Sequence, residues 1–127
     1  TKLGHGGLAD VEWTVQLMQM QHAGDVPELR TTSTIEGLRE AAEAGLLRPE
    51  DADELAAGWR MATRARNAVM LVRGKPGDQL PRSGRELAAV ASALDYPPGG
   101  DPGVFLDDYR RTTRRARAVV ERVFYGW

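Results

Sequence analysis

The sequence predicts an all-α protein, built as a single antiparallel bundle of about five helices. Three observations predict this class. Apolar residues recur at helical spacing, glycine and proline divide the chain into helix-length segments, and no segment alternates apolar and polar residues as a half-buried strand does. Short connections favour antiparallel packing of neighbouring helices. The 127 residues suit one domain with its own core, which we expect to span residues 1–127.

The first helix is predicted over residues 8–23, before Gly24, and it has two apolar faces. When its residues are plotted at about 100 degrees each, two apolar groups lie roughly opposite each other. One group consists of Leu8, Val11, Val15 and Met18, and the other of Trp13, Leu17 and Met20. Two polar seams separate them, formed by Glu12, Gln16 and Gln19 and by Asp10, Thr14 and Gln21. A helix with this pattern is covered on both sides. A face left open by the bundle is therefore a candidate docking surface for a missing neighbour.

The second and third helices are marked by their end residues. Ser33 and Glu36 form a capping-box pattern, which predicts a helix over residues 34–44 that ends at Gly45. Pro49 at a first helical position and Gly74 after the last predict a third helix over residues 49–73. Its acidic residues come early and its arginines late, which complements the helix dipole.

The fourth and fifth helices follow the same rules. Ser83 with Glu86 is a second capping box, and it predicts a helix to about Leu94, before two prolines. The fifth helix is predicted from about residues 101–102 to Tyr125. Its expected core residues are Ala116, Val119, Val120 and Val123.

The arginines of the fifth helix form the densest basic patch of the chain: Arg110, Arg111, Arg114, Arg115, Arg117 and Arg122. This patch is either a solvated helix face or a surface for a phosphate-rich or acidic partner, for which Arg111, Arg114 and Arg115 are the candidates.

The bulk composition narrows the classes of function. Seventeen basic and eighteen acidic residues nearly cancel, so neither a nucleic acid nor a membrane is an expected partner. The chain has no cysteine, which excludes disulfides and cysteine catalysis and is compatible with a reducing cytoplasm. It also has no apolar run of about 20 residues and no signal-peptide pattern. We therefore expect a cytoplasmic protein.

Few residues carry the pattern of a chemical site. His5 and His22 lack the spacing of a metal site, and no serine sits in a nucleophile elbow. The glycines before the first helix could bring backbone amides to a phosphate or carboxylate, or could form a simple entry turn. Asp10 and Glu12 lie about 200 degrees apart on the helix, so they are not expected to share a metal ion. Asp10 is then expected to interact with the helix dipole, and Glu12 to make a polar contact in the seam that it forms with Gln16 and Gln19.

One segment resembles a known family signature. Residues 2–16, KLGHGGLADVEWTVQ, resemble the pattern K-x-G-x-G-G-[LI]-x-D-[IV]-E-[FW]-x-[VA]-Q of bifunctional glutamine synthetase adenylyltransferases/deadenylases. The segments 30–34, 44–47, 64–67 and 106–110 are similar to the actinobacterial branch, as is the ending 123–127. The resemblance covers nearly the whole chain.

The resemblance implies a part of an enzyme. Members are similar to two fused copies of a nucleotidyltransferase domain followed by a helical bundle: one half adds AMP from ATP to a tyrosine of glutamine synthetase, and the other removes it by phosphorolysis. An aspartate at the position of Asp10 implies the C-terminal, adenylylating half. Members bind metal through a Gly-Ser and Asp-x-Asp motif on the catalytic sheet. Asp51-Ala52-Asp53 has the second spacing but begins a helix and lacks the Gly-Ser. The parent is thus expected to use ATP and Mg²⁺, and this chain alone to be inactive, with no cofactor or metal site.

The resemblance also implies where the signature acts. Lys2, Gly4, Gly6, Gly7, Asp10, Glu12 and Gln16 would lie where the catalytic sheet meets the bundle. They would line the nucleotide cleft or brace the domain junction, and we favour bracing because both apolar faces of the first helix need cover. The implied partners are glutamine synthetase, the nucleotidyltransferase domain of the same enzyme and a P-II-type signal protein. Two alternatives stay open: a regulatory module that receives glutamine or the P-II protein, and a stand-alone helical adaptor.

Overall fold

The computed structural model describes residues 8–75, 80–81, 84–97 and 99–125, and it confirms the all-α prediction. Its elements are α1 (Leu8–His22), the short 3₁₀ helix η1 (Pro27–Leu29), α2 (Thr34–Glu43), α3 (Pro49–Arg73), α4 (Gly84–Ala93) and α5 (Gly103–Tyr125). These described residues contain no strand. The five predicted helices are all present, with ends within two residues of those predicted. The 3₁₀ helix was not predicted.

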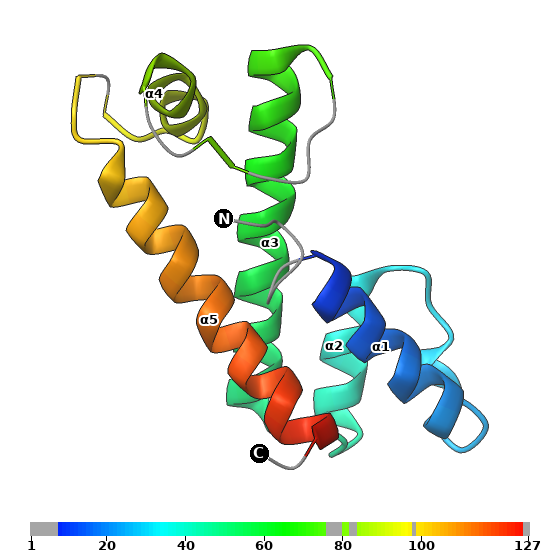
Figure 1. Ribbon diagram of the computed structural model, residues 1–127. Helices are drawn as coiled ribbons and strands as arrows, with labels where there is room; N and C mark the ends of the chain where they lie inside the picture. The colour runs from blue at the N-terminus through cyan, green and yellow to red at the C-terminus, as the bar shows by residue number, and fades with distance from the viewer. Residues whose placement is uncertain (1–7, 76–79, 82–83, 98, 126–127) are drawn as a thin grey trace.

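The two longest helices form the frame of the bundle (Figure 1). α3 and α5 run antiparallel and contact each other more extensively than any other pair. α1 and α2 pack against the N-terminal half of α3, and α4 lies at its C-terminal end. None of the described helices is long and apolar enough to cross a membrane.

The bundle has two hydrophobic cores, one at each end of the α3–α5 pair. The α1–α2 core consists of Val11, Val15, Met18, Leu29, Leu38, Ala41, Leu47, Ala52, Leu55, Ala116, Val119 and Val120. The α4 core consists of Ala62, Ala65, Ala68, Val69, Leu80, Leu87, Val90, Ala91, Leu94, Phe105, Leu106 and Tyr109. Trp59, in the middle of α3, packs against both. Ala116, Val119 and Val120 are buried and Val123 packs against the α1–α2 core, as predicted for α5.

The predicted ends of α2 are correct in part. Ser33 caps the helix, because its hydroxyl accepts a hydrogen bond from the Glu36 amide at 3.2 Å. The reciprocal half of the capping box is wrong: the Ser33 amide donates to the Thr31 hydroxyl, and the Glu36 carboxylate pairs with Arg39. Gly45 has a φ of +78°, the left-handed conformation that favours glycine after a helix. The second predicted capping box involves Ser83, which lies outside the described residues.

The two faces of α1 have different surroundings. Val11, Val15 and Met18 are buried in the α1–α2 core, as predicted for the first face; the side chain of Leu8 lies outside the described residues. Trp13 and Met20 on the second face are 53% and 80% exposed. Close packing of α1 on α2 depends on Gly37, where an added Cβ would lie 2.7 Å from Cγ1 of Val15. Among the described residues, the other helices therefore cover α1 on one side only.

Candidate functional site

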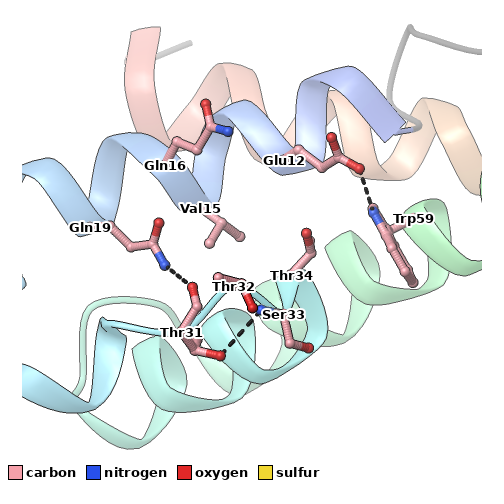
Figure 2. A pocket seen from close by; sticks show the side chains of 9 residues that line it. All are labelled: Glu12, Val15, Gln16, Gln19, Thr31, Thr32, Ser33, Thr34 and Trp59. Carbon is pink, nitrogen blue, oxygen red and sulfur yellow. Dashed lines mark hydrogen bonds between the residues drawn. The ribbon is translucent and has the colours of Figure 1, made fainter.

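A polar groove runs between α1, the start of α2 and the middle of α3 (Figure 2). It has a volume of about 620 Å³. Its lining residues are Glu12, Val15, Gln16, Gln19, Thr31, Thr32, Ser33, Thr34 and Trp59. The groove thus combines two segments that the sequence analysis singled out separately, the signature helix and residues 30–34.

Gln19 fixes the wall of the groove formed by the chain between η1 and α2. Its side-chain amide donates to the carbonyl oxygens of Leu29 and Thr31, each at 2.7 Å. The Thr31 hydroxyl in turn accepts from the Ser33 amide at 3.2 Å. These bonds hold a row of hydroxyl groups beside α1. Gln19 was not a predicted site residue, although its place in the same polar seam as Glu12 and Gln16 was a signal for it.

Glu12 joins α1 to α3. Its carboxylate accepts a hydrogen bond from the indole Nε1 of Trp59 at 3.2 Å, across the end of the groove (Figure 2). Gln16 extends from the outer side of α1, away from Thr31 (Figure 2). No sequence pattern indicated the contact between Trp59 and Glu12, because 47 residues separate them.

The chemistry of the groove is that of a polar contact surface. Hydroxyls, amides and one carboxylate line it, and none of the lining residues is basic. Such groups exchange hydrogen bonds with a polypeptide or another neutral polar surface. A polyphosphate would need cations to offset its charge, and the described lining supplies none.

Asp10 lies on the other flank of α1 and contacts α5. Its carboxylate accepts a hydrogen bond from Arg117 at 3.2 Å, and its carbonyl oxygen accepts one from the Thr14 hydroxyl at 2.8 Å. Arg117 also pairs with Glu121 at 2.9 Å. The Glu121 carboxylate, followed by Asp10, raises the pKa of the Arg117 guanidinium. The two signature acids therefore point to different helices, as their spacing predicted, and connect α1 to α5 and α3.

The predicted basic surface on α5 is divided. Arg111 pairs with Asp108 at 2.5 Å, and Asp108 also accepts from the Tyr96 hydroxyl at 2.6 Å. Burial, followed by Asp108, raises the pKa of Tyr96 to about 12. Arg114 and Arg115 are exposed and make no ion pair within the described residues. Arg114 and Arg115 therefore present their charge to solvent.

Some of the predicted positions lie outside the described residues, and others lie away from the groove. Lys2, Gly4, Gly6 and Gly7 lie outside the described residues. Asp51 is buried and pairs with Arg48 and with Arg122 of α5, so this acid of the Asp51-Ala52-Asp53 segment connects α3 to α5, whereas Asp53 is exposed. Within the part of the chain that the structure describes, no three acidic or histidine side chains gather as a metal site would require.

The fold and the groove define the class of protein. It is a small helical domain, and among its described residues the first helix has one buried face and one face exposed to solvent. Comparison with known proteins identifies the family. The chain belongs to the GlnD PII-uridylyltransferase family, whose model matches residues 1–124.

The chain is also similar to long curated relatives. The bifunctional glutamine synthetase adenylyltransferase/adenylyl-removing enzyme of Streptomyces avermitilis is 63% identical over 99% of the chain. The enzymes of the same name from Mycobacterium avium and Nocardia farcinica are 60% and 57% identical over 98%. The chain spans 12% of the length of each relative. These matches confirm the resemblance of the signature segment, and they do not favour the regulatory-module and stand-alone alternatives.

Proposed function

We propose that the chain is the helical domain that follows the nucleotidyltransferase domain in the adenylylating half of a glutamine synthetase adenylyltransferase. The whole enzyme would transfer AMP from ATP to a tyrosine of glutamine synthetase. The observation that carries this proposal is the similarity to enzymes of that name, at 63% identity over 99% of the chain. The chain's share of 12% of the relative supports a role as one domain among several.

The geometry around α1 supports a bracing role for the signature. Asp10 and Glu12 each bond to a different helix of the bundle, so both acids help to set the direction of α1. The groove beside Glu12 and Gln16 has a lining suited to a polypeptide surface and lacks cations for a phosphate chain. We therefore assign the groove side of α1 to the junction with the nucleotidyltransferase domain. Lys2, Gly4, Gly6 and Gly7 would approach that domain from the segment before α1.

ATP and Mg²⁺ belong to the nucleotidyltransferase domain in this proposal. The described residues of this chain do not fit a metal ion, because they gather no set of three suitable ligands. No step of AMP transfer is assigned to them. The chain would instead hold glutamine synthetase or the catalytic domain in position, and Arg114 and Arg115 are exposed charges that could meet an acidic partner surface.

Removal of residues 1–127 from the full-length enzyme tests the proposal. Radiolabelled AMP transfer to glutamine synthetase should fall at least tenfold, equivalent to about 1.4 kcal/mol or more in the barrier. Phosphorolytic removal of AMP is the internal control, and it should keep its rate because it belongs to the other half. Full transfer by the shortened enzyme, or transfer by residues 1–127 alone, would contradict the proposal.

A further inference from the structure

The outer face of α1, formed by Trp13, Leu17 and Met20, is an apolar surface that no other helix among the described residues covers. Trp13 is 53% exposed and Met20 is 80% exposed, while Leu17 is half-buried. Trp13 and Met20 are seven residues apart and so project from the same side of the helix. The buried residues Val11, Val15 and Met18 occupy the opposite side.

The bundle holds this face in a fixed direction. Asp10 connects one flank of α1 to Arg117 of α5 at 3.2 Å, and Glu12 connects the other flank to Trp59 of α3. Gln19 connects the C-terminal half of α1 to the chain before α2. Rotation of the helix to bury Trp13 would break these contacts. These contacts therefore keep the apolar face of α1 exposed to solvent.

We propose that the outer face of α1 is the docking surface for the polypeptide that precedes α1 in the full-length enzyme. This inference rests on the proposed function, which places a nucleotidyltransferase domain before the bundle. α1 is about 22 Å long. A domain attached at its start lies within reach of both Trp13 and Met20.

The size of the face distinguishes this occupant from a second copy of the chain. At the exposures of Trp13 and Met20, the free apolar area is on the order of 300 Å². A standard interface between separate proteins buries about 800 Å² on each partner, so this face alone is too small for a stable dimer. A tethered domain has an effective concentration near the millimolar range and needs less area to stay docked. Gln16 lines the polar groove and is a helical neighbour of Trp13 and Met20, three and four residues away, so a domain that covers this face also borders the groove.

The chain offers a matched control on another helix. Leu71, near the C-terminal end of α3, is 80% exposed, the same as Met20. The chain has no native cysteine. Met20→Cys and Leu71→Cys therefore place one thiol on the proposed docking face and one on an equally exposed apolar position elsewhere.

The test measures maleimide labelling of the two variants in the full-length enzyme, resolved by peptide mass spectrometry and normalised to the rate in denaturant. Met20→Cys should label at least tenfold more slowly than Leu71→Cys, at every enzyme concentration and without glutamine synthetase. Equal rates would overturn the inference. Protection that grows with enzyme concentration would assign the face to a second copy, and protection only with glutamine synthetase would assign it to the substrate protein; either result also overturns it. AMP transfer by the enzyme lacking residues 1–127 tests the proposed function separately.

Discussion

The two ends of the α3–α5 pair are built from different residues. The α4 core contains the buried aromatic residues Phe105 and Tyr109, and Phe105 lies 5.5 Å from the Tyr96 ring and 6.2 Å from the Tyr109 ring between centroids. The buried residues of the α1–α2 core are all aliphatic. That end also carries the polar groove, with Glu12 and Gln16 of the signature in its lining. From this difference we expect residues of the α4 core to contribute more to the free energy of unfolding. At the α1–α2 end, some residues pack in the core and others line the polar groove.

The largest expected effect is the loss of an aromatic residue from the α4 core. Phe105→Ala should lower the free energy of unfolding by about 3–5 kcal/mol, because Phe105 is fully buried and contacts two rings. Val11→Ala in the α1–α2 core is the comparison, with a smaller loss of roughly 1.6 kcal/mol from transfer alone. Urea unfolding of the two variants measures both. Equal losses would remove the proposed difference in stability between the two ends.

A smaller effect is expected where α1 meets α2. Gly37→Ala would bring a Cβ to 2.7 Å from Val15, and overpacking of this kind costs about 1–3 kcal/mol. A gain in helix propensity of up to about 1 kcal/mol offsets part of that cost. The sign should reverse when Val15→Ala removes the clashing methyl group, so that Gly37→Ala then stabilises the chain. A double-mutant cycle by urea unfolding gives the coupling. If Gly37→Ala has the same effect in both backgrounds, the close approach of the helices does not limit packing there.

The smallest effect on stability is expected for the exposed arginines of α5. Combined Arg114→Glu and Arg115→Glu changes should move the free energy of unfolding by less than about 1 kcal/mol, because exposed charges contribute little. In the full-length enzyme the same pair should weaken binding of glutamine synthetase, as measured by titration at two salt concentrations. Arg60→Glu with Arg66→Glu on α3 is the matched reversal and should leave binding unchanged. If both pairs of substitutions weaken glutamine synthetase binding to a similar extent, the net charge of the chain, and not the position of Arg114 and Arg115, explains the loss.

The sequence predicted the helices well because their end signals are local. Gly45, Gly74 and Pro49 act on the residues beside them, and the structure has helix ends where these residues indicate. The same local reasoning was wrong about the second half of the capping box, since the Ser33 amide donates its hydrogen bond to the Thr31 hydroxyl instead. It also missed η1, which is only three residues long.

The candidate site was less predictable because its contacts join distant parts of the chain. Glu12 and Gln16 were predicted as site residues, but the groove also needs Trp59 and residues 31–34. Asp51 has the position of a helix-start acid, and only the fold brings Arg122 to it across 71 residues. Periodicity identified the second apolar face of α1. It did not indicate that Asp10 and Glu12 would hold that face outward by binding to α5 and α3.

Asp10→Asn in the full-length enzyme is the most direct test of the proposal that the signature helix serves AMP addition. The substitution keeps the size of the side chain and removes the charge that pairs with Arg117. Arg117→Gln breaks the same contact from α5. We expect both variants to slow AMP addition to glutamine synthetase by tenfold or more, with AMP removal unchanged and stability altered by less than about 1 kcal/mol. A slowing by Asp10→Asn alone would replace bracing with a direct role for Asp10 in the cleft. Equal losses of AMP addition and AMP removal, or a loss no larger than the loss of folded protein, would contradict the claim.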